Sequence, residues 1–293
     1  MVYKKINYFL LSLSLIFFVS CSNNSKNFES NIHFDIENCN ISSPQPTKES
    51  LKADNEIYII GHAYGAPGKG NFFPENLVNF FSEKLDPDQI NHIALTGDFV
   101  RINNIESFKR VKNYIDNNFS NYFLSVGNHE VGEEIGNLEN YHENFNEVLF
   151  YQEFNEFLII SANFSNENWL PTIDYQRQIN SIIDNTNKEN IIILSHQLFW
   201  LEEINYEISA NSDSLLSSRL NKDSLSWIRN NDKNYIVISG DYGAWGDTTY
   251  CKKINNRLFI ASGIGDTEND SIIKIYDYKN SLLIKEVNIN TKG

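Results

Sequence analysis

The segment Phe123-Leu-Ser-Val-Gly-Asn-His-Glu130 decides the fold of this chain. A short apolar run that ends in a glycine turn is typical of a buried strand, and this turn carries Asn, His and Glu side chains. Ligands of open α/β sheets gather outside the carboxyl ends of strands, so several such endings predict one shared site. Four other segments have the same layout: Tyr58-Ile-Ile-Gly-His62, Ile93-Ala-Leu-Thr-Gly-Asp98, Ile191-Ile-Ile-Leu-Ser-His196 and Tyr235-Ile-Val-Ile-Ser-Gly-Asp241.

Strand and helix patterns alternate along the chain from residue 55 onward. Apolar residues at helical spacing predict helices near 75–84, 105–118, 173–184 and 219–231. Besides the five segments above, strands are predicted at 147–152, 157–162, 258–262, 272–278 and 282–289. Alternating strands and helices with β-rich additions predict an α/β sandwich.

The first 20 residues have the layout of an export signal. Lys4 and Lys5 form a positive region, and the apolar stretch Phe9–Val19 is short for a membrane span. The ending Phe18-Val-Ser-Cys21 resembles the lipobox of bacterial lipoproteins, which implies cleavage before Cys21 and a lipid on that cysteine. A plain secretory signal and an uncleaved anchor are the alternatives. The reading adopted is a lipoprotein signal peptide at 1–20 and a membrane-anchored protein of the cell envelope.

Residues 21–54 are interpreted as a flexible tether between the lipid and a domain at 55–293, because they are rich in Asn, Ser and Lys. The alternation of apolar residues within 32–39 suggests that this part docks on the domain. An export route permits a disulfide between Cys39 and Cys251. Two free buried thiols are an equal alternative.

The charge of the chain excludes one class of partner. Removing residues 1–20 takes away two lysines and no acidic residue, so 22 basic and 38 acidic residues remain, a formal charge of −16. Such a surface repels polyphosphate backbones. No nucleic-acid partner is therefore expected.

The order of the polar endings resembles the calcineurin-like metallophosphoesterases, over about residues 56–265. Gly97-Asp98, Gly127-Asn-His-Glu130 and Ser195-His196 match three motifs of that family. The resemblance implies two mixed sheets packed together and flanked by helices, with loops that hold two metal ions sharing one Asp. It also implies Asp98 as the bridging ligand, Asn128 and His196 as further ligands, and His129 as the residue that steadies the phosphoryl oxygens.

The first and fifth motifs depart from that family. The first is usually Gly-Asp-x-His-Gly, and here reads Gly61-His-Ala-Tyr-Gly65; the fifth is usually Gly-His-x-His, and here reads Gly240-Asp-Tyr-Gly243. Tyr64 is interpreted as a wall or hydrogen-bond donor, and Glu130 as a salt-bridge or capping residue. One metal pocket is expected to be well formed and the other altered or empty. The well-formed pocket is expected to be built from Asp98, Asn128, His196 and Asp241, with His62 as a further ligand. The expected cofactor of the protein is divalent Mn, Fe, Zn or Mg, as one or two ions.

The leading hypothesis is a metal-dependent phosphoesterase that hydrolyses a phosphomonoester or phosphodiester at the cell envelope, on a small phosphoester or an envelope polymer. His129 is its expected catalytic residue, because it follows Asn128 on the same turn. The alternative is a catalytically weak or inactive relative that binds a glycan or protein partner. A third hypothesis is a structural lipoprotein with coincidental motifs, which predicts that the five expected ligands do not converge in space.

Overall fold

The computed structural model describes much of the predicted domain and a short part of the segment before it. The signal peptide, Cys21 and most of the predicted tether lie outside the described residues. No helix among the described residues is long and apolar enough to cross a membrane. The described residues are 32–37, 39, 53–66, 68, 70–86, 88–131, 137–164, 172–211, 226–229, 232–244 and 249–290.

The first of two sheets has the strand order β1-β12-β11-β2-β3-β4. Strands β2, β3 and β4 are parallel, β11 is antiparallel to both of its neighbours, and β1 is parallel to β12. This sheet is therefore mixed, and β1 and β4 form its edges. Its strands span Ile32–Asp35 (β1), Asn55–Ile60 (β2), Asn91–Thr96 (β3), Asn121–Ser125 (β4), Ser271–Tyr278 (β11) and Ser281–Asn288 (β12).

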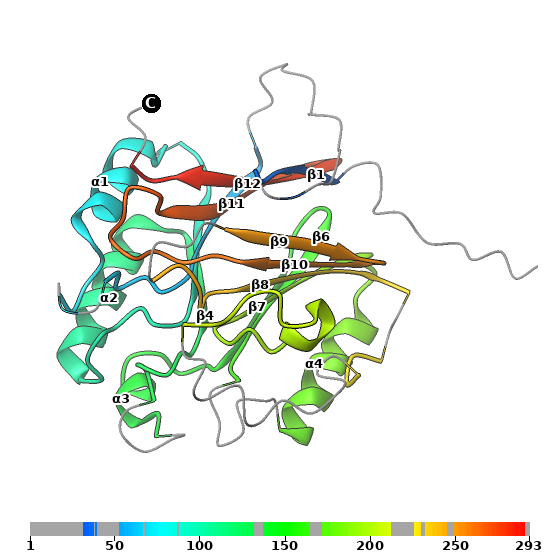
Figure 1. Cartoon of the computed structure of the whole chain (residues 1–293), viewed down its shortest axis with the longest axis horizontal. Helices are drawn as coiled ribbons and strands as arrows, with labels where there is room; N and C mark the ends of the chain where they lie inside the picture. The colour runs from blue at the N-terminus through cyan, green and yellow to red at the C-terminus, as the bar shows by residue number, and fades with distance from the viewer. Residues whose placement is uncertain are drawn as a thin grey trace, which may run out of the picture.

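The second sheet has the strand order β5-β6-β7-β8-β10-β9. Its four inner strands are parallel, and the edge strands β5 and β9 are antiparallel to their neighbours. Figure 1 shows the two sheets as stacked layers. Two mixed sheets with flanking helices confirm the predicted fold class. The strands of this sheet span Leu149–Glu153 (β5), Phe157–Ala162 (β6), Asn190–Ser195 (β7), Asn234–Ser239 (β8), Tyr250–Ile254 (β9) and Arg257–Ala261 (β10).

Both faces of the central strands are buried, which explains their continuous apolar runs. In β2, Ile57 and Ile59 belong to a core between the sheets that also holds Ile192 of β7. Tyr58 and Ile60, which alternate with them, belong to a second core together with residues of the helices. A strand buried on both faces has no polar face to alternate with, so its polar residues collect at its ends.

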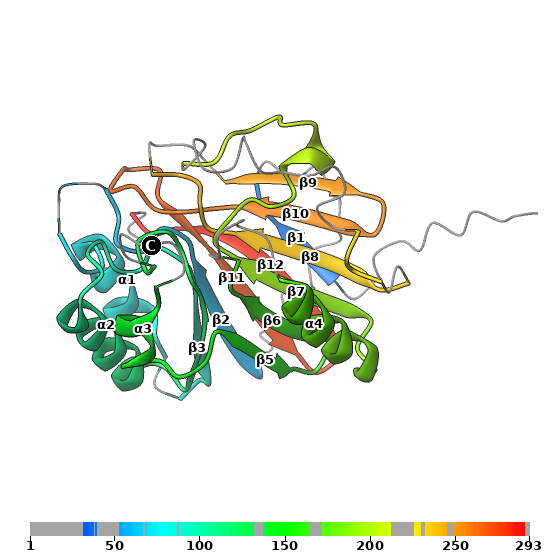
Figure 2. The same cartoon turned by 90° about the horizontal axis from the view of Figure 1, so that it is seen from below.

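The helices cover the outer faces of the two sheets. Figure 2 shows α1 (Glu75–Lys84) and α2 (Ile105–Asn118) beside the first sheet, and α4 (Ile173–Asn185) beside the second. The side chains of Asn104 and Thr172 cap α2 and α4 by accepting hydrogen bonds from backbone N–H groups of the first turn. Two short helical turns complete the described elements: α3 (Glu139–His142) and the 3-10 helix η1 (Leu201–Ile204).

One sequence prediction is confirmed in part, one strand was missed, and one predicted helix falls largely outside the described residues. The segment Ile32–Asp35 docks on the domain, as expected for 32–39: it is strand β1, whose buried Ile32 and Phe34 pack in the core between the sheets, so these residues are not part of a flexible tether. Strand β9 was not predicted at all. The helix predicted at 219–231 lies largely outside the described residues, and its described part, 226–229, is a turn and irregular chain.

A disulfide joins Cys39 to Cys251 across 212 positions of sequence, with the two Cα atoms 5.0 Å apart. Cys39 follows β1, an edge strand of the first sheet, and Cys251 lies in β9, an edge strand of the second. The bond therefore closes one side of the sandwich covalently. It decides between the two alternatives that the sequence left open for these cysteines.

Candidate metal centre

The structure brings the five polar strand endings together. His62 follows β2, Asp98 follows β3 and Asn128 follows β4 in the first sheet, while His196 follows β7 and Asp241 follows β8 in the second. These strands are parallel within each sheet, so their carboxyl ends share one edge. The site thus lies where the carboxyl-terminal edges of the two sheets meet.

The donor atoms of these residues lie close to one another. His196 Nε2 is 3.2 Å from Asn128 Oδ1, 3.4 Å from Asp98 Oδ1 and 3.7 Å from Asp241 Oδ1. His62 Nε2 is 3.6 Å from Asp98 Oδ2. Asn128 is half-buried and the other four are buried. This convergence removes the hypothesis of coincidental motifs.

Unusual backbone geometry holds two of these residues in place. His62 has φ 49° and Asp98 has φ 52°, a left-handed conformation that is uncommon for residues other than glycine and that collects at functional sites. Two glycines allow the close approach of the loops. A Cβ at Gly97 would lie 2.5 Å from the ring of His196, and one at Gly127 would lie 2.3 Å from Asp98 Oδ1.

Glu130 ties the loops after β3 and β4 together. Its fully buried carboxylate accepts hydrogen bonds from the backbone N–H groups of Gly127 (2.7 Å), Asp98 (2.8 Å), Phe99 (2.8 Å) and Val100 (3.0 Å). Burial and the nearby Asp98 raise its pKa to about 7, although the N–H donors oppose that rise. Of the two sequence interpretations, salt-bridge or capping residue, the capping one agrees with these bonds: Glu130 caps backbone N–H groups of two site loops.

The two histidines turn their Nε2 atoms toward the oxygen atoms. His196 Nδ1–H donates to the Thr96 carbonyl (3.0 Å) and His62 Nδ1–H donates to the Ile264 carbonyl (3.2 Å). Because a carbonyl only accepts, Nδ1 carries the proton in each neutral ring, and Nε2 keeps its lone pair. Backbone carbonyls behind Nδ1 are the usual support of metal-binding histidines. Neither carbonyl could be identified as a partner from the sequence.

The centre is therefore a buried convergence of metal-ligand atoms. The carboxylates of Asp98 and Asp241, the amide oxygen of Asn128 and the Nε2 atoms of the two histidines face one another. Although burial lowers the pKa of His196, the carboxylates of Asp98 and Asp241 outweigh it and hold that pKa above its usual range. Burial also acts to raise the pKa of Asp98, but the rings of His196 and His129 hold it below its usual range. Both shifts indicate a site that attracts a cation.

The chemistry of this donor set fits a divalent ion. Donor atoms around an ion bound at about 2.1 Å lie roughly 3.4 Å apart in a tetrahedral arrangement, which is close to the separations in the cluster. Mixed carboxylate, amide and imidazole donors suit Zn, Fe and Mn, and the oxygens suit Mg. In the described part of the chain, no group of three or more His, Cys, Asp or Glu side chains is already arranged so that it could hold a metal ion.

The position of the second ion expected from the resemblance is closed in two ways. The Tyr64 hydroxyl donates to His129 Nε2 (3.2 Å), as its sequence interpretation as a hydrogen-bond donor predicted, and the Tyr64 ring lies 4.4 Å from the ring of His62. Gly243 has φ 90°, and a Cβ there would lie 2.6 Å from the carbonyl oxygen of Gly263. This backbone leaves no room for a side chain at position 243, so it cannot present the second histidine of the family's fifth motif.

His129 lies beside the cluster and is held from both ring nitrogens. Its Nδ1–H donates to the Arg101 carbonyl (2.8 Å), and its Nε2 accepts from Tyr64. Its backbone N–H donates to Asp98 Oδ1 (3.2 Å). The ring is half-buried, so part of it is open to solvent.

No protein-family model and no curated protein sequence matches this chain. Among solved structures, a purple acid phosphatase from yellow lupin (Lupinus luteus) seeds matches with a TM-score of 0.58 at 13% identity, over 83% of this chain and 53% of the phosphatase. Phosphopantetheinyl hydrolase from Mycobacterium tuberculosis matches with a TM-score of 0.47 at 8% identity, over 81% of this chain and 97% of that chain. A putative 5'-nucleotidase from Staphylococcus aureus matches with a TM-score of 0.47 at 11% identity, over 82% of this chain and 55% of the nucleotidase.

The chain spans about half the length of the lupin phosphatase that it matches. At this level of identity the similarity concerns the fold and not the activity. The two sheets described above, their flanking helices and the lupin match agree with one another. The chain has the two-sheet α/β sandwich fold of metallophosphoesterase type.

Proposed function

We propose that this protein is a metal-dependent phosphoesterase that holds one divalent cation among His62, Asp98, Asn128, His196 and Asp241. The observation that carries the proposal is the buried convergence of carboxylate, amide and imidazole atoms within 3.2–3.7 Å of one another. A divalent ion in such a site supplies Lewis-acid chemistry and neutralises phosphoryl oxygens. Its identity is proposed as Mn, Fe, Zn or Mg.

His129 is proposed to bind the phosphoryl group. Its Nδ1–H is committed to the Arg101 carbonyl, which fixes the plane of the ring, and the Tyr64 hydroxyl occupies Nε2 until a substrate arrives. Once a substrate displaces the Tyr64 hydroxyl, Nε2 of His129 would face a phosphoryl or leaving-group oxygen and exchange a hydrogen bond with it.

The proposed activity is slower than that of an enzyme with two ions. Position 243 offers no side chain and Tyr64 takes the place of a histidine, so a second Lewis acid has few ligands here. The proposed substrate is a small phosphomonoester or phosphodiester, or a phosphoester within an envelope polymer. The formal charge of −14 disfavours nucleic acid as substrate.

The proposed location is the bacterial cell envelope, with the chain anchored to the membrane through a lipid on Cys21. The signal-like residues 1–20 support export. The disulfide between Cys39 and Cys251 also supports export, because structural disulfides persist in oxidising compartments. Mass spectrometry of the protein extracted from bacterial membranes tests the lipid directly, and an unmodified Cys21 would contradict the anchor.

Hydrolysis of aryl phosphates tests the activity. The chain from residue 22 onward is assayed on p-nitrophenyl phosphate and on bis(p-nitrophenyl) phosphate, with each of the four metals added. We expect Asp98→Asn and His196→Ala to abolish the metal-dependent rate, and His142→Ala, at an exposed histidine outside the cluster, to retain it. Equal rates for wild type, Asp98→Asn and His196→Ala would refute the proposal.

A second candidate is a non-catalytic protein that uses the same site to bind a glycan or protein partner. The closed position at Gly243 and the Tyr64–His129 hydrogen bond favour it. Thermal unfolding distinguishes the two candidates, because an ion that binds only the folded state stabilises it. A metal-dependent rise in Tm that Asp98→Asn removes supports the metal centre, whereas the absence of any rise supports the second candidate.

A further inference from the structure

A cavity of about 380 Å³ lies at the end of β4 opposite the metal centre. Asn121 begins β4 and lines the cavity, whereas Asn128 of the metal centre follows the other end of the strand. The cavity forms where β4 and β5, the edge strands of the two sheets, approach each other on the side away from the disulfide. Its volume falls within the ~300–1,000 Å³ that small-molecule sites occupy.

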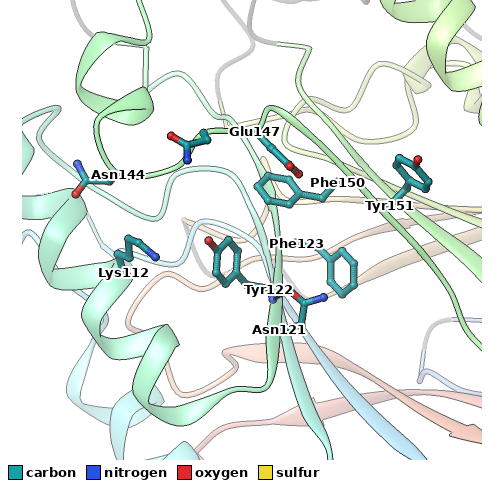
Figure 3. Close-up of a pocket in the computed structure, with 9 residues that line it drawn as sticks. Lys112, Asn121, Tyr122, Phe123, Asn144, Glu147, Phe150 and Tyr151 are labelled. Atoms are coloured by element: carbon teal, nitrogen blue, oxygen red, sulfur yellow. Dashed lines mark hydrogen bonds between the residues drawn. The ribbon is translucent and has the colours of Figure 1, made fainter.

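Four aromatic side chains line this cavity, and one of them, Phe123 of β4, is buried in the core between the sheets. Tyr122 comes from β4, and Phe150 and Tyr151 come from β5; Figure 3 shows Tyr122 and Phe150 at its centre and Tyr151 to one side. The centroids of Tyr122 and Phe150 are 5.8 Å apart at an interplanar angle of 61°. Tyr151 is 59% exposed, which is high for so large a ring. The solvent-exposed ring of Tyr151 is therefore available to stack on an apolar face of a ligand.

The polar groups around these rings include both donors and acceptors. The Lys112 ammonium lies 5.5 Å from the centroid of Tyr122 and pairs with Asp116 on α2 at 2.8 Å, so its charge is already compensated. The exposed Glu147 carboxylate also lines the cavity. An anionic ligand would face this carboxylate without a free cation among the described lining residues. A purely apolar ligand would leave the polar groups unpaired, which is unfavourable.

We propose that this cavity binds a neutral carbohydrate of one or two rings. A sugar ring has apolar C–H faces that stack on aromatic side chains, and hydroxyl groups that donate as well as accept. The cavity provides both kinds of partner: the rings of Tyr122, Phe150 and Tyr151, and the hydrogen-bonding groups of Lys112, Asn146 and Glu147. The inference does not depend on the phosphoesterase activity, because the two sites share no residue.

Ligand-observed NMR with the chain from residue 22 onward tests the inference. The neutral probes are N-acetylglucosamine, its β-1,4-linked disaccharide, maltose and cellobiose; glucose 6-phosphate and an uncharged acetylated tripeptide represent other classes of ligand. We expect at least one neutral sugar to bind at millimolar concentration. Preferential binding of glucose 6-phosphate or of the peptide would overturn the proposal, as would the absence of binding by all four sugars.

Three variants locate the binding. Tyr151→Ser removes an exposed ring, and Glu147→Gln removes an exposed charge, so neither substitution disturbs the core. Tyr206→Ser is the matched control, because Tyr206 is 53% exposed and lies outside the cavity. Losing about 1.4 kcal/mol of stacking and burial corresponds to a tenfold rise in Kd, which we expect for Tyr151→Ser and not for Tyr206→Ser.

Glu147→Gln is expected to weaken the same sugar measurably. The hydrolysis rate on aryl phosphates is expected to stay unchanged in Tyr151→Ser and Glu147→Gln, which separates this site from the metal centre. Sugar binding that survives both cavity variants unchanged would show that the sugar binds elsewhere, and would refute the proposal.

Discussion

Removal of the disulfide offers a quantitative test of the fold. Cys39→Ser opens a loop that joins the edge strands of the two sheets across 212 positions. In the chain-entropy description, a cross-link over n residues removes about 2.1 + 1.5R ln n cal/mol/K from the unfolded chain. For this loop that is about 18 cal/mol/K, or about 5 kcal/mol at room temperature. Total stabilities of domains are roughly 5–15 kcal/mol, so this bond contributes a large share.

Urea unfolding of the chain from residue 22 onward measures this contribution. We expect Cys39→Ser, Cys251→Ser and the double variant to lose the same free energy of unfolding, because each removes the same bond. Reduction of the wild-type protein is expected to lower its stability to that of the variants. The slope m is expected to rise in all of them, because an uncrosslinked unfolded chain exposes more surface.

A different outcome would refute this reasoning. A loss below about 1 kcal/mol in all variants would mean that the bond does not restrict the unfolded chain, or that β1 leaves the sheet before the remainder unfolds. Hydrogen exchange of the β1 amides separates these two explanations. Unequal losses between the single variants would show that one cysteine also has a packing role of its own.

Three further predictions concern buried polar residues and a backbone contact. Glu130→Gln replaces one carboxylate oxygen by an NH₂ group that cannot accept, which leaves two of the four buried N–H donors unpaired. Each unpaired donor costs roughly 1–3 kcal/mol, so urea unfolding should show a loss of about 2–6 kcal/mol in the free energy of unfolding. The control Glu83→Gln, at an exposed position, should lose almost none. Burial lowers the pKa of His92 from 6.5 to about 4 in the folded protein. Between these two pH values the unfolded chain binds a proton that the folded protein does not, so the free energy of unfolding falls as pH drops from about 6.5 to 4, by at most about 3 kcal/mol. His92→Gln should remove this pH dependence. Gly243→His introduces the histidine of the family motif, but it places a Cβ against the Gly263 carbonyl at positive φ. We therefore expect thermal unfolding to show a loss of stability of roughly 2 kcal/mol or more. We also expect elemental analysis to find no second equivalent of bound metal.

Most of the fold could be predicted because its central strands are buried on both faces. Such strands are continuous apolar runs, and each predicted run corresponds to an observed strand. Strand β9 was missed because Tyr250-Cys-Lys-Lys-Ile254 is a partly exposed edge strand, in which two lysines interrupt the apolar pattern. β9 belongs to the sheet because it pairs with the following strand, β10. The periodicity of apolar residues within one segment does not indicate such a pairing.

The candidate site was predictable in its side chains and not in its supports. The five expected ligands each end a strand, and strand direction alone places them at one edge. The carbonyls of Thr96 and Ile264, which orient His196 and His62, depend on backbone positions that carry no sequence signal. The closure of position 243 likewise follows from the backbone of Gly263, a neighbour distant in sequence.

The four hydrogen bonds to Glu130 also limit how the site can change. Since one carboxylate fixes the loops after both β3 and β4, neither loop can be reshaped without releasing the other. A designer who transfers the Gly-Asp or the Gly-Asn-His-Glu segment to another sandwich should therefore move both, as a single part with their shared anchor.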